Sequence, residues 1–258
     1  MEACAPEPEL RAAAGLVFVE DLDSPRLSAD DAHHLGDVLR LKPGETVAAA
    51  DGSGSWRTCA FIASTAPARS RGSSLRRGTE GRFGLEAAGA IRHGERALPE
   101  VEIGFSWAKA ERTEWAVAKL VELGVDVLTP LVSDRTVVRP DTDGARRREQ
   151  RLRRIVREAA MQSRRPFLAR IGATESLDDV AGRSCLSSVA LAEPGGGAVS
   201  LETPVVLVGP EGGWSPRELA LVDNKVSLGD GVLRVETAAL AAGTLLTALR
   251  AKALRTPS

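Results

Sequence analysis

The 258-residue sequence has too little cysteine and histidine for a fold built on disulfides or a metal. Its three cysteines, Cys4, Cys59 and Cys185, are far apart and no clustered histidines accompany them, so neither a disulfide framework nor a zinc site is predicted. His33 and His34 are adjacent and would point in different directions from a helix. We therefore predict no metal, and a reducing compartment, the cytoplasm, fits the cysteine usage best.

Long apolar runs are also missing. A membrane-spanning helix needs about 20 apolar residues, and the longest run here, residues 238–249, is interrupted by Gly243, Thr244 and Thr247. The acidic N-terminus lacks the basic start of a signal peptide. We predict no association with a membrane.

Several common catalytic signatures are absent as well. The sequence contains no serine-nucleophile elbow, no Walker A motif and no GxGxxG motif, which excludes the commonest hydrolase, NTPase and dinucleotide-binding classes. The formal net charge of −1 indicates no partner by itself, so any partner has to be inferred from local charge.

What the sequence does contain is a strand, a glycine-rich loop and a helix start in direct succession. Residues 205–208 form a short apolar run, typical of a buried parallel strand, which ends at Gly209 and Pro210. Ser215 and Glu218 then flank a proline in the pattern of a capping box, which opens a helix. Such a loop can bring backbone groups against a ligand at the carboxyl edge of a sheet. Alone, it is equally well explained as a tight turn.

A second glycine loop favours the ligand site. Residues 226–229 end another short strand, and residues 230–237 lead into a helix rich in alanine and leucine. Two such loops, so close in sequence, predict one shared pocket.

The chain before residue 99 predicts a small β-barrel-like module. The Asp51-Gly52 step between two strands is a hairpin signal. Residues 1–14 are expected to be a frayed tail and residues 65–84 a mobile loop rich in Ser, Gly and Arg. The expected elements are strands at 16–19, 45–50 and 56–62 and a helix at 29–40.

From residue 99 onward, strands and helices alternate, which predicts a parallel α/β sheet. A loop is expected at 194–197, where a proline precedes three glycines. The expected strands are 101–107, 125–131, 167–171, 186–192 and 205–208, and the expected helices include 112–123 and 145–162.

Positive charge is concentrated between Arg139 and Arg170, a segment that contains 11 arginines and only four acidic residues. Such a local excess is typical of contact with a nucleic-acid backbone. A solvated helix face is the alternative, but Lys109, Arg112, Arg135 and Arg139 lie at nearby element ends and favour nucleic acid. The residues of the helix that oppose its apolar stripe are Arg147, Arg151 and Arg154.

Taken together, the motifs resemble those of the RsmE family, the 16S ribosomal RNA uridine-N3 methyltransferases. The central motifs are Gly209-Pro210-Glu211-Gly212-Gly213 and Leu228-Gly229-x-x-Val232-Leu233-Arg234-x-Glu236-Thr237-Ala238. Supporting stretches occur, in the family's order, at residues 33–40, 51–54, 119–125 and 157–163. The chain departs from the family pattern at Asp230 and Gly231, where Pro-Arg is usual.

The resemblance implies an α/β fold in which a SPOUT-type knotted parallel-sheet methyltransferase domain follows a small PUA-like β-barrel domain. The PUA-like RNA-binding domain would comprise residues 1–98, and the methyltransferase domain, with a C-terminal trefoil knot, residues 99–258. It also implies S-adenosyl-L-methionine (AdoMet) as cofactor, a homodimer, and 16S ribosomal RNA or the small ribosomal subunit as partner.

The resemblance and the charge pattern together give a set of site residues. The expected cofactor-binding residues are Leu191, Glu193, Val208, Gly209, Pro210, Glu211, Gly212, Gly213, Leu228, Gly229, Leu233, Thr237 and Ala238. The expected RNA-binding residues are His34, Arg40, Lys109, Arg112, Arg139, Arg147, Arg151, Arg154, Gln162 and Arg165.

Two residues are expected to be catalytic. Arg234 would stabilise negative charge that develops on the uridine carbonyls. Glu236 would either orient Arg234 or take the N3 proton, unless it is only a helix N-terminal carboxylate favoured by the dipole. Glu211 is expected to fix its loop by accepting backbone amides.

Two other functions remain open from the sequence. One is a SPOUT methyltransferase that acts on another RNA position or on a ribose hydroxyl. The other is a non-catalytic RNA-binding protein of ribosome assembly, against which the intact glycine loops argue.

Overall fold

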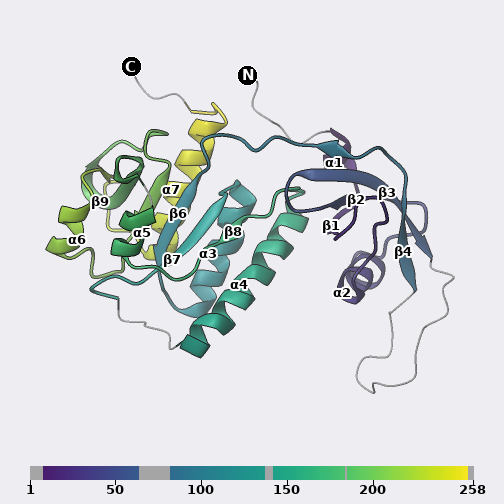
Figure 1. Cartoon of the computed structure of the whole chain (residues 1–258), viewed down its shortest axis with the longest axis horizontal. Coiled ribbons are helices and arrows are strands. Elements are labelled where there is room, and N and C mark those ends of the chain that lie inside the picture. Colours follow the sequence, from purple (N-terminus) through teal and green to yellow (C-terminus); the bar gives the residue numbers. More distant parts are fainter. Residues whose placement is uncertain (1–7, 64–81, 137–141, 184, 255–258) are drawn as a thin grey trace. The chain divides into compact units, whose positions relative to one another are not determined.

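The computed structural model describes residues 8–63, 82–136, 142–183 and 185–254 (Figure 1). The chain forms two compact units. Of the described residues, 8–63, 82–96 and 160–167 belong to the first unit, and 97–136, 142–159, 168–183 and 185–254 belong to the second. The domain boundary after residue 98 stays a prediction. No local sequence signal indicates that residues 160–167 pack with the first unit.

The first unit is built on a five-stranded sheet. Its hydrogen-bonded order is β1-β2-β3-β4, with β5 also paired to β3. β1 is parallel to β2, and the other pairings are antiparallel. The strands are β1 (Gly15–Phe18), β2 (Thr46–Ala50), β3 (Ser55–Ala63), β4 (Phe83–Ala87) and β5 (Arg92–His93).

The hairpin predicted at Asp51 is confirmed, and it joins β2 to β3. The Asp51 carboxylate accepts hydrogen bonds from the backbone N–H of Ser53 (2.7 Å) and Ser55 (3.0 Å). Although partial burial opposes it, these serine hydrogen bonds lower the pKa of Asp51 overall. The turn is therefore held by the side chain of its first residue.

Three short helical elements belong to the same unit. They are α1 (Pro8–Ala12), α2 (Ala29–His33) and a π-helix (His34–Val38) that continues α2. The prediction of a frayed tail was wrong for residues 8–14, because Leu10 and Ala13 are buried. The predicted loop at 65–84 lies mostly outside the described residues, but Phe83 belongs to β4 and stacks on Phe61 with ring centroids 5.0 Å apart.

The second unit confirms the predicted parallel α/β architecture. Its six-stranded sheet has the order β11-β9-β10-β6-β7-β8, and every pairing is parallel. The strands are β6 (Glu102–Ser106), β7 (Val127–Leu131), β8 (Arg170–Ile171), β9 (Val189–Gly197), β10 (Val205–Val208) and β11 (Lys225–Val226). The helices are α3 (Ala110–Leu123), α4 (Thr142–Gln162), α5 (Leu177–Arg183), α6 (Pro216–Leu221) and α7 (Val235–Arg250), with a 3₁₀ turn at Leu186–Ser188.

Two predicted strands and one predicted loop differ from the observed elements. The strand expected at 186–192 begins only at Val189, after the 3₁₀ turn. The strand expected at 167–171 begins only at Arg170, because Phe167 bridges to Gly52 and Ser53 of the first unit and lies under the guanidinium of Arg96. The loop expected at 194–197 is the second half of β9. A Cβ on Gly196 would lie 2.6 Å from the Val226 backbone nitrogen, so this glycine permits close approach of β11 rather than a turn.

Helix α7 is packed closely against α3 and β6. A Cβ on Gly243 would lie 2.6 Å from the Leu120 side chain, so the glycine brings the two helices together. At the C-terminal end of α7, Arg250 forms a buried ion pair with Asp126 and donates to the carbonyl of Gly124 (2.7 Å). Among the described residues, no helix is both long enough and apolar enough to span a membrane.

Candidate functional site

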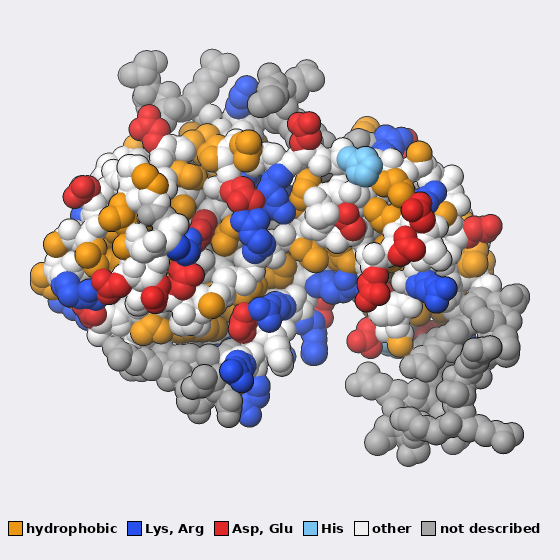
Figure 2. Space-filling model, in the orientation of Figure 1, with side chains coloured by type: hydrophobic (Ala, Val, Ile, Leu, Met, Phe, Trp, Pro, Cys, Tyr) orange, Lys and Arg blue, Asp and Glu red, His pale blue; other side chains and the backbone are white. Residues whose placement is uncertain are grey.

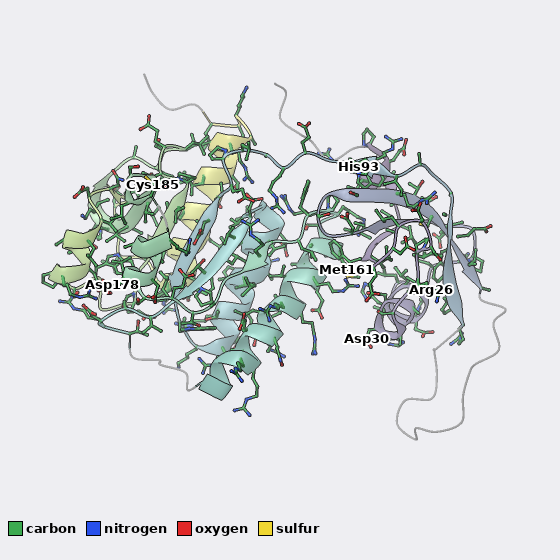
Figure 3. The ribbon with its side chains drawn as sticks, viewed as in Figure 1. Arg26, Asp30, His93, Met161, Asp178 and Cys185 are labelled. Atoms are coloured by element: carbon green, nitrogen blue, oxygen red, sulfur yellow. The ribbon has the colours of Figure 1, made fainter. Side chains whose placement is uncertain are left out.

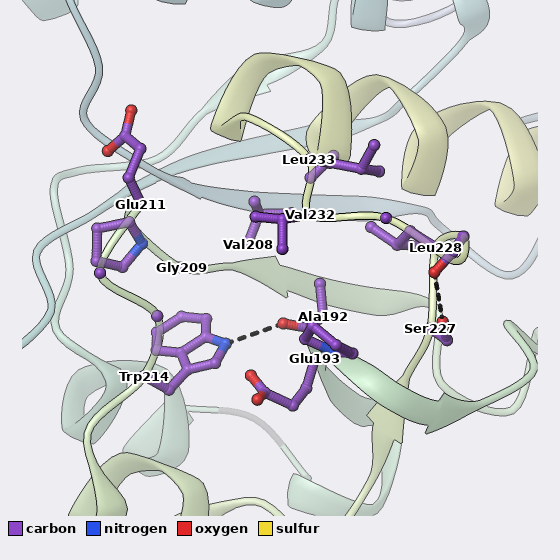
Figure 4. A pocket seen from close by; sticks show the side chains of 17 residues that line it. Ala192, Glu193, Val208, Gly209, Glu211, Trp214, Ser227, Leu228, Val232 and Leu233 are labelled. Carbon is purple, nitrogen blue, oxygen red and sulfur yellow. Dashed lines mark hydrogen bonds between the residues drawn. The ribbon is translucent and has the colours of Figure 1, made fainter.

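The two glycine loops contribute to one cavity, as predicted. It has a volume of about 310 Å³ and lies beside the second half of β9 and beyond the ends of β10 and β11 (Figure 4). The size is at the lower end of the range for small-molecule sites. The first turn of α7 closes one side through Ala238.

Most of the predicted cofactor-binding residues line this cavity. Leu191 and Thr237 do not: Leu191 is fully buried in the apolar core, and Thr237 is exposed on the first turn of α7. Those that do are Glu193, Val208, Gly209, Pro210, Glu211, Gly212, Gly213, Leu228, Gly229, Leu233 and Ala238. The cavity is also lined by Ala192, Pro194, Gly231 and Val232, which belong to the same segments, and by Trp214 and Ser227, which were not expected there.

Trp214 connects two walls of the cavity. Its indole Nε1 donates to the carbonyl of Ala192 across 3.2 Å (Figure 4). A Cβ on Gly209 would lie 2.9 Å from the indole Cε2, so only glycine fits against the ring. The signal for Trp214 was its position at the end of the glycine loop, but the partner on β9 could not be read from sequence.

The glycine loop itself is a tight turn that is anchored by α6. Gly213 has φ +68°, and its N–H donates to the carbonyl of Pro210 (2.8 Å). The capping box predicted for Ser215 and Glu218 is confirmed, with both reciprocal hydrogen bonds present. Glu211 was expected to fix the loop by accepting backbone amides, and this prediction is wrong. Its side chain is exposed, points away from the cavity and accepts no hydrogen bond from the described residues (Figure 4).

The two predicted catalytic residues lie at the start of α7. Arg234 is the N-cap residue and is exposed. Glu236 is largely buried, with 12% of its side chain exposed, and its Oε1 lies 3.7 Å from Nε of Arg112. Glu236 Oε2 is buried without a hydrogen-bond partner among the described residues. Glu236 is thus paired with Arg112, and no described hydrogen bond or ion pair joins it to Arg234.

Helix α4 carries the predicted basic face, which Figure 2 shows as Lys and Arg side chains gathered over the region of this helix. Arg147 and Arg154 are exposed, and no described carboxylate pairs with them. Arg151 is already paired with Glu114, and the charge and hydrogen bonds of this arginine lower the pKa of Glu114. Arg153 pairs with Glu149. The available charge is therefore smaller than the arginine count indicates.

The other predicted RNA-binding residues are distributed over both units. His34 and Arg40 are exposed in the first unit, and Lys109 is exposed at the N-cap of α3. Gln162 is exposed at the end of α4, whereas Arg165 is half-buried. Arg139 lies outside the described residues. No group of three or more His, Cys, Asp or Glu side chains with metal-binding geometry occurs in the part of the chain that the structure describes.

Two family models match parts of the chain, one mainly in each unit. Residues 95–247 match a family described as the RNA methyltransferase domain, and residues 27–66 match one described as the RNA methyltransferase PUA domain. A protein of Synechocystis sp. named ribosomal RNA small subunit methyltransferase E is 31% identical over 240 residues, covering 86% of this chain and 72% of that protein. The same-named protein of Mycobacterium bovis is 30% identical over 241 residues, covering 84% and 83%.

The chain belongs to the ribosomal RNA small subunit methyltransferase E family. Solved structures agree with this membership. The crystal structure of a probable rRNA-methyltransferase from Porphyromonas gingivalis has a TM-score of 0.74 at 27% identity, with 93% of this chain and 100% of that chain covered. A ribosomal RNA small subunit methyltransferase E from Neisseria gonorrhoeae, bound to S-adenosyl methionine, has a TM-score of 0.70 at 25% identity, with 91% and 97% covered.

Within this methyltransferase family, the match at residues 95–247 spans the parallel sheet and every residue of the cavity. The PUA match spans α2, the π-helix, β2 and β3 of the first unit. The predicted pairing of a PUA-like domain with an α/β methyltransferase domain is thereby confirmed.

Proposed function

We propose that this protein transfers a methyl group from AdoMet to N3 of a uridine in 16S ribosomal RNA of the small subunit. The observation that carries the proposal is the cavity enclosed by two glycine loops and β9, in a chain of this family. Two relatives that cover most of the chain carry the name ribosomal RNA small subunit methyltransferase E, which supports the small-subunit substrate.

The residues of the cavity fit AdoMet. Val208, Leu228 and Leu233 offer apolar surface to an adenosine, and the bare backbone near Gly209 allows its close approach. The Glu193 carboxylate at the cavity wall supplies negative charge that complements the sulfonium and ammonium groups. When bound, AdoMet supplies an electrophilic methyl group, so the protein chiefly has to align the acceptor with it.

The acceptor has to lose a proton. Uridine N3 lies on the base-pairing edge and is protonated, so the uridine must be unpaired and the proton must go to a base. We assign this role to Glu236 Oε2, which is buried and unpaired while Arg112 holds the other oxygen. Arg234, exposed at the start of the same helix, would stabilise the negative charge on the uridine carbonyls.

The remaining expectations concern binding and assembly. Arg147 and Arg154 of α4, together with the PUA-like unit, would bind the RNA backbone, chiefly by charge. We also propose that the chain forms a homodimer, that its C-terminal half contains the trefoil knot of its family, and that it acts in the cytoplasm, where ribosomal RNA is available. Light scattering of the purified protein tests the dimer.

Nucleoside analysis tests the activity. Small-subunit RNA would be incubated with the protein and AdoMet, digested and analysed by mass spectrometry. We expect 3-methyluridine to appear only when both are present. A ribose-methylated nucleoside, or another methylated base, would instead favour a methyltransferase of different specificity. AdoMet binding without methylation of any RNA would favour the non-catalytic alternative.

A further inference from the structure

The connection between β7 and α4 is bonded to the glycine loop of the cavity. Arg135 Nη1 donates to the carbonyl oxygen of Gly212, at 2.8 Å, and Gly212 lines the cavity. One residue earlier, the Asp134 N–H donates to Glu218 Oε1, at 3.0 Å. The segment at residues 134–135 thus touches both the glycine loop and the helix that follows it.

Asp134 is fixed by several further contacts. Its Oδ2 accepts a hydrogen bond from Ser215 Oγ, at 2.5 Å, and its Oδ1 accepts one from Arg217 Nη2, at 3.1 Å. Arg217 also pairs with Asp178 of α5, which Figure 3 labels, at 2.8 Å. Glu218 is 1% exposed and also receives the Ser215 N–H. The backbone beneath Arg135 is therefore rigid relative to α6.

Most N–H groups of the Arg135 side chain remain available for a ligand. A guanidinium carries five N–H groups, of which the contact with Gly212 uses one. The side chain is exposed, and no carboxylate among the described residues pairs with it. Such a planar, permanently charged edge matches the geometry of a phosphate. Arg135 is also one of the basic residues at element ends that favour nucleic acid in the sequence, so an RNA phosphate is the ligand expected on its free edge.

We propose that Arg135 is a positioning residue that couples RNA binding to AdoMet binding. An RNA phosphate on the free edge of the guanidinium would restrict the side chain, and the opposite edge would then hold the Gly212 carbonyl and the wall of the cavity in place. The first ligand to bind pays the entropic cost of ordering this wall, and the second ligand then does not. Each ligand should therefore tighten the binding of the other by the same factor. This inference rests on the proposed function, since it requires that the cavity binds AdoMet and that the protein binds RNA.

Calorimetry measures this coupling directly. Sinefungin, an unreactive AdoMet analogue, would be titrated into the protein with and without a saturating oligouridylate. For the wild type we expect RNA to lower the sinefungin Kd by about fivefold or more, as for typical coupled sites. In Arg135→Ala, this ratio should fall to about one, and sinefungin should still bind without RNA. Arg135→Lys keeps the positive charge but lacks the planar guanidinium with its several donors. It should restore only part of the RNA-dependent tightening of sinefungin.

Arg153→Ala is the matched control, because it removes one exposed arginine that is paired with Glu149 instead. It should leave the coupling intact. Equal weakening of sinefungin by Arg135→Ala with and without RNA would reduce Arg135 to a purely structural role and overturn the proposal. So would a wild type that binds both ligands without coupling. A wild type that binds no sinefungin would instead refute the proposed function, and this inference with it.

Discussion

Arg112 of α3 pairs with only one of the two carboxylate oxygens of Glu236, at the start of α7. Nε of Arg112 lies 3.7 Å from Glu236 Oε1, while Oε2 is buried without a described partner. A buried side-chain oxygen that accepts no hydrogen bond is unfavourable for folding. Such a cost is common where a group is reserved for a ligand, and this carboxylate belongs to the first turn of a helix that borders the cavity.

Replacement of Glu236 by Gln tests the role of this oxygen. The amide keeps the size of the side chain but cannot take the N3 proton. We expect the methylation rate at saturating AdoMet and RNA to fall by about 10²- to 10⁴-fold, as for the loss of a general base. The AdoMet Kd should change little. Glu122→Gln, on the same α3 that carries Arg112 but paired with Lys119, is the control and should retain activity. A rate near wild type would exclude Glu236 as the base.

Arg234→Ala tests the electrostatic role. Arg234 is exposed and makes no described side-chain contact, so its loss should not destabilise the fold. If it stabilises charge on the uridine carbonyls, kcat should fall by about 10²-fold or more. Arg234→Lys should restore part of the rate. Near-wild-type methylation by an Arg234→Ala protein that still binds AdoMet would show that the assignment is wrong.

Local sequence signals predicted the frame of this site, and contacts distant in sequence escaped them. The capping box at Ser215 depends on residues three apart, so the sequence contains the whole interaction. The pairing of Glu236 with Arg112 depends on the packing of α7 against α3, whereas the expected partner, Arg234, is only two residues away in sequence. Gly196 was misinterpreted for the same reason: a glycine signals backbone freedom, but only the position of β11 shows why it is needed.

Gly209→Ala should weaken AdoMet binding. The added Cβ would lie 2.9 Å from Cε2 and 3.1 Å from Cδ2 of the Trp214 indole, so the ring has to move away from the cavity wall. We expect the AdoMet Kd to rise by about tenfold or more, which corresponds to about 1.4 kcal/mol. Gly182→Ala is the control: this helical glycine has open space around its Cβ, so the exchange should leave binding unchanged. Equal affinities of the two variants would contradict a cofactor role for the Gly209 wall.

If Arg147 and Arg154 of α4 contact RNA phosphates, they should contribute to the salt dependence of RNA binding. Each phosphate contact adds to the slope of log Kd against log salt concentration, so the double exchange Arg147→Gln and Arg154→Gln should lower the slope for RNA by about two. AdoMet affinity should stay the same. Arg153→Gln removes a charge that Glu149 already offsets and should have a smaller effect. An unchanged slope in the double variant would return these residues to an ordinary solvated helix face.

The two described cysteines should differ sharply in their reaction with a disulfide reagent. Burial raises the pKa of the Cys59 thiol to about 11, with partial opposition from Arg57. Cys185 is exposed, and hydrogen bonds from Ser187 lower the pKa of its thiol. Because the thiolate is the reactive form, Cys185 is increasingly reactive as the pH rises through 8, whereas Cys59 stays protonated.

In a Cys4→Ser background, we therefore expect one thiol to react rapidly at pH 8 and the second only after denaturant is added. A Cys185→Ser exchange in the same background should remove the rapid phase. Cys59 belongs to β3, whose neighbours β2 and β4 pair with it on both sides, so its slow reaction would report the opening of the first unit's sheet. Its labelling rate should then rise with urea concentration. Rapid reaction of both thiols in native buffer would mean that this sheet opens far more readily than its buried core indicates.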